Sequence, residues 1–359
     1  MKLTLKTAVL QEMVSKAVKG ASQNKLLPLT SLMSIRLVRK QLTLTTTDAS
    51  NYLYVVQKDV EGDDFYVTVQ VEQFSKLIAK MTSETVTLEL DDSMLTVKGN
   101  GTYKIELPLD ENGSVVVYPD PIAEIATDVK PVEINLSTVK TILNTNKAAL
   151  ADDMKVPVYT NYYLGDRAVT TDMYKVCKLD AKLFDEPMLL APETMDLLDV
   201  MTDEKLSVYV LDDVVLFTSN NCVVYGHKVD GLEDFAIDAI NELLDEKFKS
   251  TCKIRKDAML SVLDRIGLFV GTYDDNEITL TFTKEGIDIS SKQSDGVETL
   301  PYVESKNFKA YTCSIDIFLL EQQLKANAAD VIELQYGNDR SVKLVDGAVT
   351  QIVALKETD

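Results

Sequence analysis

The sequence predicts an α+β protein built from three tandem repeats, and three recurring features lead to this prediction. Amphipathic helix patterns, alternating strands that end at polar turns, and helices that run directly into hairpins follow one another three times in the same order. The 359 residues also exceed what one hydrophobic core usually fills. Each repeat therefore predicts helices on one face of antiparallel sheets.

The first feature is a helix with apolar residues at i, i+3, i+4 spacing. It covers residues 5–19, 136–150 and 254–269. Each pattern begins close to a Thr, Ser or Asp, which are residue types that cap helix N-termini. We therefore expect side-chain caps at the starts of these helices.

The second feature is an alternating strand that ends at a polar turn, over residues 42–48, 168–172 and 286–292. The third is a helix followed by a hairpin. The first hairpin strands start at Val86, Leu206 and Ile332, offset by 120 and 126 residues. Such constant offsets indicate structural repeats.

Each hairpin predicts a tight turn. Asp91-Asp92, Asp212-Asp213 and Gly337-Asn338 stand where such a turn favours residues that tolerate positive φ. A pair of catalytic carboxylates is the alternative interpretation of the acidic dipeptides. The third copy has no acidic pair, which favours the turn.

Domain boundaries are predicted where periodicity weakens. One lies near residue 127, in a Pro-containing stretch, and the other near residue 250, in DEKFKST. The predicted domains are residues 1–127, 128–250 and 251–359.

The net charge of −20 initially argues against a nucleic-acid partner, because Lys and Arg drive that binding. Its distribution modifies this conclusion. Residues 1–126 carry 13 basic and 16 acidic side chains, whereas residues 127–250 carry 12 and 23. A basic surface outside the middle third is therefore compatible with the composition.

Neither a targeting segment nor a membrane span is predicted, because the first residues alternate apolar and polar side chains and no later apolar run is long enough. We expect a cytoplasmic protein. The four cysteines, at positions 177, 222, 252 and 313, have spacings that fit neither a metal knuckle nor a secreted disulfide framework. Buried free thiols are expected.

Catalytic motifs are missing from the sequence. The one histidine, His227, lies in a strand pattern without a nucleophile motif nearby, and no phosphate-binding, zinc-protease or EF-hand motif occurs. We expect no cofactor, no metal and no enzyme activity. Two alternatives stay open: an enzyme with a divergent acidic site, and a repeat scaffold that binds proteins without DNA.

The ordered segments KLLPLTSLMSIRL, LTLTTTD, PVYTNYYL, VTTDMYKV and HKVDGLEDF resemble the bacterial β-type DNA polymerase sliding clamps over the whole chain. The resemblance implies three tandem repeats of the DNA-clamp fold and a head-to-tail homodimer that closes a six-domain ring. It also implies encircled double-stranded DNA, the replicative DNA polymerase and an ATP-dependent clamp loader as partners. Its departures from the family pattern are those expected of a divergent phage- or plasmid-encoded member.

Basic residues on the helix patterns would face the DNA, whose phosphates they would attract without reading sequence. These are Lys16, Lys19, Lys76, Lys80, Lys140, Lys147, Arg265 and Lys325. Solvated helix faces are the alternative interpretation of each lysine. By resemblance, Asn24 and Lys25 match a loop that touches DNA, although the family has Arg where this chain has Asn24.

The resemblance also implies a pocket for a short partner peptide with apolar anchors. Its matching positions are Tyr159, Thr171, Met173, Tyr174, Lys175, Val176, Ser341, Ile352, Val353 and Ala354. Lys175 is expected at the rim of this pocket. Tyr174-Lys175 replaces the family's His-Arg, and core packing is the alternative for Val176, Ile352 and Val353.

Four apolar residues match the family's dimer interface. Tyr103 and Ile105 would supply one side, and Leu268 and Phe269 the other. Core packing is again the alternative.

Overall fold

The computed structural model describes residues 1–24, 26–91, 93–124, 129–152, 154–271, 276–292 and 296–357. The chain divides into two compact units. Unit 1 comprises Met1–Ser137 and Glu193–Lys228, and unit 2 comprises Thr138–Pro192 and Val229–Asp359. The terms first, second and third repeat denote residues 1–127, 128–250 and 251–359, a division that stays a prediction.

The strands of unit 1 form two antiparallel arrangements. One is β1–β6–β7–β8, and the other runs β5–β2–β3–β4–β16–β15–β14–β9. The strands are β1 (Lys2–Lys6), β2 (Leu32–Val38), β3 (Gln41–Thr47), β4 (Tyr52–Gln57), β5 (Phe65–Gln70), β6 (Thr85–Asp91), β7 (Met94–Lys98), β8 (Thr102–Glu106), β9 (Val132–Asn135), β14 (Lys205–Val210), β15 (Val214–Thr218) and β16 (Cys222–Val229). The helices are α1 (Thr7–Ala17) and α2 (Val71–Ala79), with the 3₁₀ helices η1 (Val18–Gly20), η2 (Pro28–Ser31), η3 (Pro121–Glu124) and η6 (Leu198–Val200).

Unit 2 has the same kind of arrangement. Its sheets are β20–β19–β18–β22 and the antiparallel run β13–β10–β11–β12–β25–β24–β23–β17–β21. The strands are β10 (Tyr162–Leu164), β11 (Ala168–Thr171), β12 (Lys175–Leu179), β13 (Met188–Leu190), β17 (Ser250–Arg255), β18 (Glu277–Phe282), β19 (Gly286–Ser291), β20 (Val297–Pro301), β21 (Glu304–Lys306), β22 (Tyr311–Asp316), β23 (Val331–Tyr336), β24 (Ser341–Asp346) and β25 (Val349–Ala354). The helices are α5 (Ile237–Asp245), α6 (Lys256–Ile266), α7 (Ile317–Ala326), η4 (Asn146–Ala149), η5 (Pro157–Thr160), η7 (Leu232–Asp234) and η8 (Gly267–Phe269), and two more, α3 (Leu136–Thr145) and α4 (Pro192–Leu197), cross the boundaries between the units.

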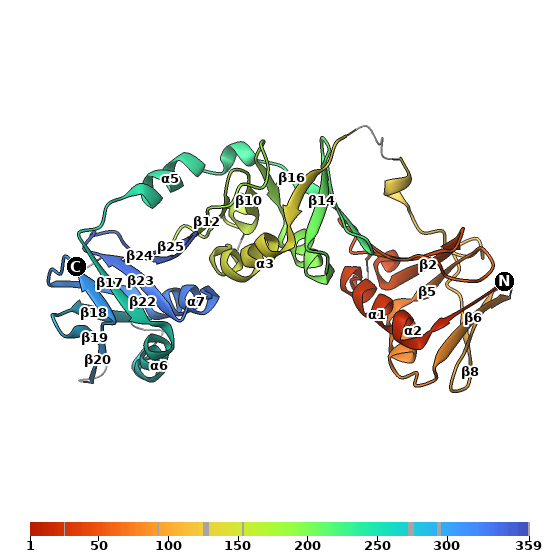
Figure 1. Ribbon diagram of the computed structural model, residues 1–359, viewed down its shortest axis with the longest axis horizontal. Helices are drawn as coiled ribbons and strands as arrows, with labels where there is room; N and C mark the ends of the chain where they lie inside the picture. The colour runs from red at the N-terminus through yellow and green to blue at the C-terminus, as the bar shows by residue number, and fades with distance from the viewer. Residues whose placement is uncertain are drawn as a thin grey trace. The chain divides into compact units, whose positions relative to one another are not determined.

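The predicted α+β repeats are confirmed by the order of these elements. A strand leads directly into a helix at β1–α1, β9–α3 and β17–α6, and hairpins follow at β6–β7, β14–β15 and β23–β24. In unit 1 α1 packs against α2, and in unit 2 α6 packs against α7 (Figure 1).

The predicted side-chain caps on the opening helices were wrong for α1 and α6. Their N-cap residues are Lys6 and Arg255, whose side chains make no cap hydrogen bond. Instead, the first helical N–H of Thr7 donates to the carbonyl of Glu84, 3.0 Å away, and that of Lys256 to the carbonyl of Asp330 at 2.9 Å. The neighbouring chain therefore satisfies a donor that a cap would otherwise bind.

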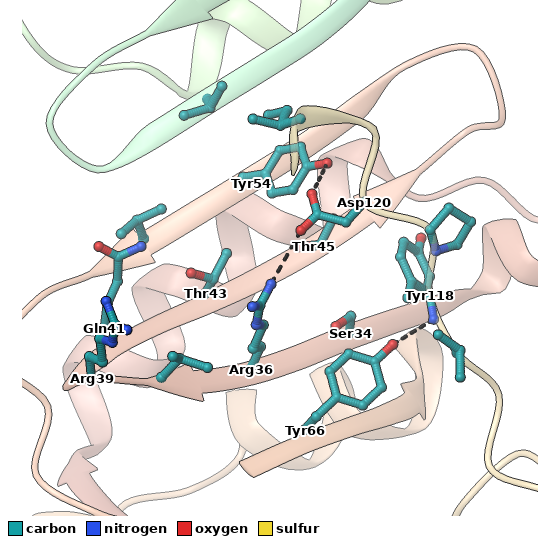
Figure 2. Close-up of a pocket in the computed structure, with 16 residues that line it drawn as sticks. Ser34, Arg36, Arg39, Gln41, Thr43, Thr45, Tyr54, Tyr66, Tyr118 and Asp120 are labelled. Atoms are coloured by element: carbon teal, nitrogen blue, oxygen red, sulfur yellow. Dashed lines mark hydrogen bonds and ion pairs between the residues drawn. The ribbon is translucent and has the colours of Figure 1, made fainter. Parts of the chain in front are cut away.

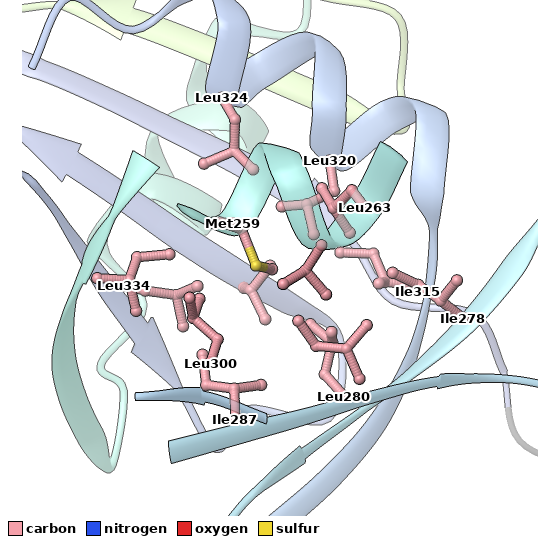
Figure 3. Close-up of a cluster of buried hydrophobic side chains, with 14 of the residues drawn as sticks. Met259, Leu263, Ile278, Leu280, Ile287, Leu300, Ile315, Leu320, Leu324 and Leu334 are labelled. Carbon is pink, nitrogen blue, oxygen red and sulfur yellow. The ribbon is translucent and has the colours of Figure 1, made fainter. Parts of the chain in front are cut away.

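The core of the third repeat illustrates how helices cover the sheets. Met259 and Leu263 of α6 and Leu320 of α7 lie in one buried cluster with Leu280 and Leu334 of the strands (Figure 3). All five are at most 1% exposed. Burial stabilises each such side chain by about 1.5–3 kcal/mol relative to exposure, which explains why apolar periodicity located these helices.

The predicted hairpin turns are only partly as expected. Leu211 N–H donates to the carbonyl of Val214 at 2.9 Å, so Asp212 and Asp213 are turn residues. Neither has positive φ, contrary to the prediction, whereas Gly337 has φ of 92°. Asp92 lies outside the described residues.

Helix α5 was not predicted from the sequence. Its apolar residues Ile237, Ile240 and Leu244 follow i, i+3, i+7 spacing, and this signal could have located it. The Lys343 ammonium donates to the carbonyl oxygens of Leu244, at 2.6 Å, and Glu246, at 3.1 Å. A buried cation thus satisfies carbonyls at the helix C-terminus, where the helix dipole favours positive charge.

Candidate functional site

A tight turn between β11 and β12 carries the two most exposed residues of the predicted peptide pocket. The Thr171 hydroxyl donates to the carbonyl of Lys175 at 2.7 Å and accepts from the N–H of Met173 at 3.0 Å. The Asp172 carboxylate accepts from the N–H groups of Tyr174, at 2.9 Å, and Lys175, at 2.6 Å. Short polar side chains therefore hold the turn and leave Met173 and Tyr174 free to project.

Met173 adopts a left-handed backbone conformation, with φ of 76°. Left-handed conformations cost an ordinary residue about 1–2 kcal/mol. The same turn occurs in the first repeat, where the Thr47 hydroxyl accepts from the N–H of Ala49 and Ala49 has φ of 90°. The turn is therefore a property of the repeat, and its exposed side chains are what distinguish the copies.

Strand pairing brings the two predicted halves of the pocket together. In the β12–β25 pair, Lys175 lies opposite Val353 and Val176 opposite Ile352. Beyond the pair, Ala354 N–H donates to the carbonyl of Tyr174 at 2.8 Å. The expectation that these separate strand ends meet is confirmed.

Lys175 is buried, not at a rim as predicted. It is 5% exposed, and its ammonium lies 2.6 Å from Gln322 Oε1 and 3.2 Å from Asp172 Oδ2. A buried ammonium requires such partners because desolvation is otherwise costly. Lys175 consequently links the turn to α7, and its charged group is not exposed to a ligand in the groove.

A groove of about 1260 Å³ lies beside this turn. Met173, Tyr174 and Ala354 line it together with Leu319 of α7 and Leu355. The groove has a mixed-charge wall, formed by Glu277, Lys292, Asp316, Lys356 and Glu357. The lining of the groove is therefore mixed, with a few apolar side chains beside polar and charged ones.

Two charges of the groove wall form a close ion pair. Lys292 Nζ lies 2.7 Å from a Glu277 carboxylate oxygen. Partial burial favours the neutral form of Glu277, but hydrogen bonds from Lys292 and Ser314 and the charge of Lys292 outweigh it and lower the pKa of Glu277. The Asp316 carboxylate caps α7 by accepting from the N–H groups of Phe318 and Leu319. The sequence prediction missed these residues because they come from four separate segments of the third repeat.

The other predicted pocket residues lie in the interior or beside it. Val176 and Ile352 pack in one buried cluster, against which the half-buried Tyr159 packs, and Val353 packs in another. Thr171 and Ser341 are 2% exposed. Period-two alternation explains the difference, since neighbouring strand residues point to opposite faces and only some of them reach the groove.

Some of the predicted DNA-facing residues make ion pairs, and others are exposed. Four of them make ion pairs: Lys16 with Glu12, Lys76 with Glu72, Arg265 with Glu298, and Lys325 with Glu321. Lys19, Lys80, Lys140, Lys147 and Asn24 are exposed. Lys25 lies outside the described residues.

The predicted interface residues are not equally accessible. Tyr103 is 42% exposed, Leu268 81% and Phe269 52%, whereas Ile105 is 2% exposed. The side chain of Ile105 is therefore part of the core. Three of the four residues offer apolar surface to a partner.

The one histidine of the chain packs against an aromatic ring. His227 lies on β16 with its ring edge-on to Tyr225 at 5.3 Å between centroids. Among the described residues no cluster of three or more His, Cys, Asp or Glu side chains could hold a metal ion. Nor is any described helix long and apolar enough to span a membrane.

The described residues thus form an α+β protein with a surface groove beside the β11–β12 turn. Residues 1–111 match the family model of the DNA polymerase III beta subunit, N-terminal domain. No curated protein matches the sequence significantly.

Solved structures are similar over the full length of both chains. They include the DNA polymerase sliding clamp from Bacillus subtilis (18% identity, TM-score 0.85), the beta subunit from DNA polymerase of Streptococcus pyogenes (16%, 0.87) and the DNA polymerase III beta subunit from Thermotoga maritima (16%, 0.83), each covering 100% of both chains. The whole chain therefore has the fold of the bacterial sliding clamps, and the resemblance seen in the sequence is confirmed.

Proposed function

We propose that this protein is a sliding clamp, a non-catalytic processivity factor that encircles duplex DNA and tethers the replicative polymerase. The observation that carries the proposal is the full-length similarity to sliding clamps, at TM-scores of 0.83 to 0.87. The match of residues 1–111 to the beta-subunit family model supports it independently at the level of sequence. Such a factor acts in the cytoplasm, at the replication fork.

The proposed assembly is a head-to-tail homodimer of three-domain chains, loaded by an ATP-dependent clamp loader. The exposed apolar side chains of Tyr103, Leu268 and Phe269 are its proposed contacts, because they match the interface positions that the resemblance implies and aromatic residues are enriched at the cores of interfaces. Two different surfaces on one chain make a heterologous contact, which closes a ring when the rotation permits.

Attraction to DNA would come from the exposed lysines on the helices and at their ends. Lys19, Lys80 and Lys140 make no ion pair with any described residue, so their charges are available to phosphates. Exposed ammonium groups attract phosphates without reading sequence, and each phosphate contact contributes roughly −0.9 to the slope of log K against log salt. Weak, salt-dependent attraction is what sliding requires.

The groove at Met173 and Tyr174 is the proposed docking site for partner peptides, including the polymerase. Its apolar side chains, which include Met173, Tyr174 and Leu319, would cover a large apolar anchor, since a few buried side chains supply most of the affinity of such contacts.

Retention on DNA tests the proposed function. The protein is loaded with its clamp loader and ATP onto nicked circular DNA, and half of the sample is then linearised. A ring stays on the circle and leaves the linear molecule, with no dependence on sequence. Tight binding to a short linear duplex, or loss from both forms, would contradict the proposal.

Charge reversal tests the DNA-facing surface. Lys19→Glu and Lys80→Glu should each weaken attraction to DNA and reduce its salt dependence. Lys58→Glu is the matched control, because Lys58 is exposed in the same unit but lies outside the helices. Equal losses in all three variants would indicate non-specific charge effects.

A further inference from the structure

Unit 1 contains a pocket of about 650 Å³ that the proposed function does not use. It lies on β2, β3, β4 and β5 (Figure 2). Thr43 and Thr45 of β3 line it, whereas the hydroxyl of the next residue, Thr46, donates to the carbonyl of Ala17 of α1. Because strand side chains alternate, the pocket is on the sheet face opposite α1.

An extended part of the chain already lies on this face. In this bridging segment, residues 116–122, the carbonyl of Val116 accepts from Thr68, and the N–H of Tyr118 donates to the Tyr66 hydroxyl. Asp120 accepts from the Tyr54 hydroxyl at 3.1 Å and from Arg36 at 3.2 Å (Figure 2). The face therefore holds a peptide through a carboxylate and large side chains.

The same face of the second repeat is covered differently. The β4–β16 pair, where Tyr52 lies opposite Tyr225, has its repeat counterpart in the β12–β25 pair. There Ile240 and Leu244 of α5 pack in the buried cluster that contains Val176 and Ile352. In the first repeat the bridging segment covers only part of the face, and the pocket is the part that it leaves open.

The open end of the pocket combines a free cation with apolar side chains. Arg39 and Gln41 lie at the end away from Tyr66 and Tyr118 (Figure 2). Within the described part of the chain, the exposed guanidinium of Arg39 has no hydrogen-bond or ion-pair partner. Beside it, Val38, Val56 and Val223 are only half-buried.

Arg39 also stands in a costly backbone conformation. Arg39 and Lys40 form the β2–β3 turn with φ of 51° and 66°, where Asn and Gly are the usual residues. Left-handed conformations are unfavourable for long side chains. The turn therefore places a basic residue at the pocket, although Asn or Gly would fit the backbone conformation of this turn at lower cost.

We propose that this pocket binds a short segment of a partner protein carrying a carboxylate and a nearby large apolar side chain. The carboxylate would pair with Arg39, since guanidinium and carboxylate form strong, directional hydrogen bonds. The apolar side chain would cover Val38, Val56 and Val223. Charge complementarity and the way Asp120 is held on the same face favour this occupant, and the proposal does not depend on the groove at Tyr174.

The probe is a set of fluorescein-labelled synthetic peptides with one Glu and one Phe, separated by Gly-Ser spacers of increasing length. Fluorescence anisotropy is measured against the full chain at low salt. At least one spacer length should bind, and the same peptide with Gln in place of Glu should bind about tenfold more weakly. Absence of saturable binding for every spacer would overturn the proposal.

Two neighbouring substitutions distinguish site binding from general charge. Arg39→Gln should weaken binding about tenfold, while Lys40→Gln should leave it unchanged, because Lys40 pairs with Glu61 and does not line the pocket. Thr43→Trp fills the pocket and should abolish binding, with an unchanged thermal midpoint as the check on folding. Equal effects of the Arg39 and Lys40 variants, or a loss caused by Tyr174→Ala, would place the peptide elsewhere.

Discussion

Removing the two projecting side chains of the β11–β12 turn should weaken partner docking without affecting the fold. Met173 is 57% exposed and Tyr174 62% exposed, so neither contributes much to the core. The turn is held by Thr171 and Asp172, which the substitutions Met173→Ala and Tyr174→Ala leave intact. A change in docking would therefore report on contacts made to the peptide.

The magnitude follows from exposed area. An aromatic side chain buries roughly 200 Å² when fully covered. Covering the 62% of Tyr174 that is now exposed would bury about 120 Å², or about 3 kcal/mol at ~25 cal/mol per Å². Ordering the side chain costs about 1 kcal/mol. The net loss of about 2 kcal/mol predicts binding weaker by more than tenfold.

The assay is titration of the labelled terminal peptide of the cognate polymerase. The unaltered protein, the double variant and Met154→Ala are compared, since Met154 is 70% exposed in the same unit but outside the groove. The control should bind as the unaltered protein does, and dimer mass and thermal midpoint should be constant. Equal affinity of the double variant would refute the assignment of the docking site.

Three further predictions concern the assembly, acid stability and thiol reactivity. Replacing Leu268 and Phe269 by Asp should yield a folded monomer in light scattering, because an interface would bury unpaired charge; an intact dimer would refute the interface. The folded-state pKa of Glu277 is lowered, so its stabilisation is present above the unfolded-state value of about 4.3 and is lost as pH falls through the folded-state value. Glu277→Gln should therefore flatten the acid side of the urea-unfolding profile, and an unchanged slope would contradict this reasoning. Burial raises the pKa of the Cys177 and Cys313 thiols to about 12, so iodoacetamide at neutral pH should label them only after denaturation, and rapid labelling of the native protein would refute their burial.

The repeat could be predicted because apolar periodicity and burial have the same cause. The helices at α1, α3 and α6 were located by residues such as Leu10 and Met259, which are fully buried. The pairing of β12 with β25 was expected only through the resemblance, since strands so far apart in sequence leave no local signal of their register.

The predictions that were wrong concern residues whose burial depends on which face of their strand is covered by other parts of the chain. Lys175 and Ile105 both stand on strands with interior and exterior positions one residue apart, and sequence did not fix which side was covered. The ammonium group of Lys175 can be buried because it donates a hydrogen bond to Gln322, which is 147 residues away in the sequence. Helix caps were likewise wrong because a carbonyl from another part of the chain replaced the local side chain.

The ion pairs on the helix surfaces bear on how a strongly acidic chain could hold DNA. Lys76 and Glu72 are four residues apart on α2, and their side chains are 69% and 63% exposed. Exposed pairs of this kind contribute only about 0–1 kcal/mol. An approaching phosphate could therefore replace the carboxylate at little cost, and it would leave as easily. An exposed pair such as Lys76–Glu72 thus limits the attraction to DNA without abolishing it, which is the balance that the proposed sliding function needs.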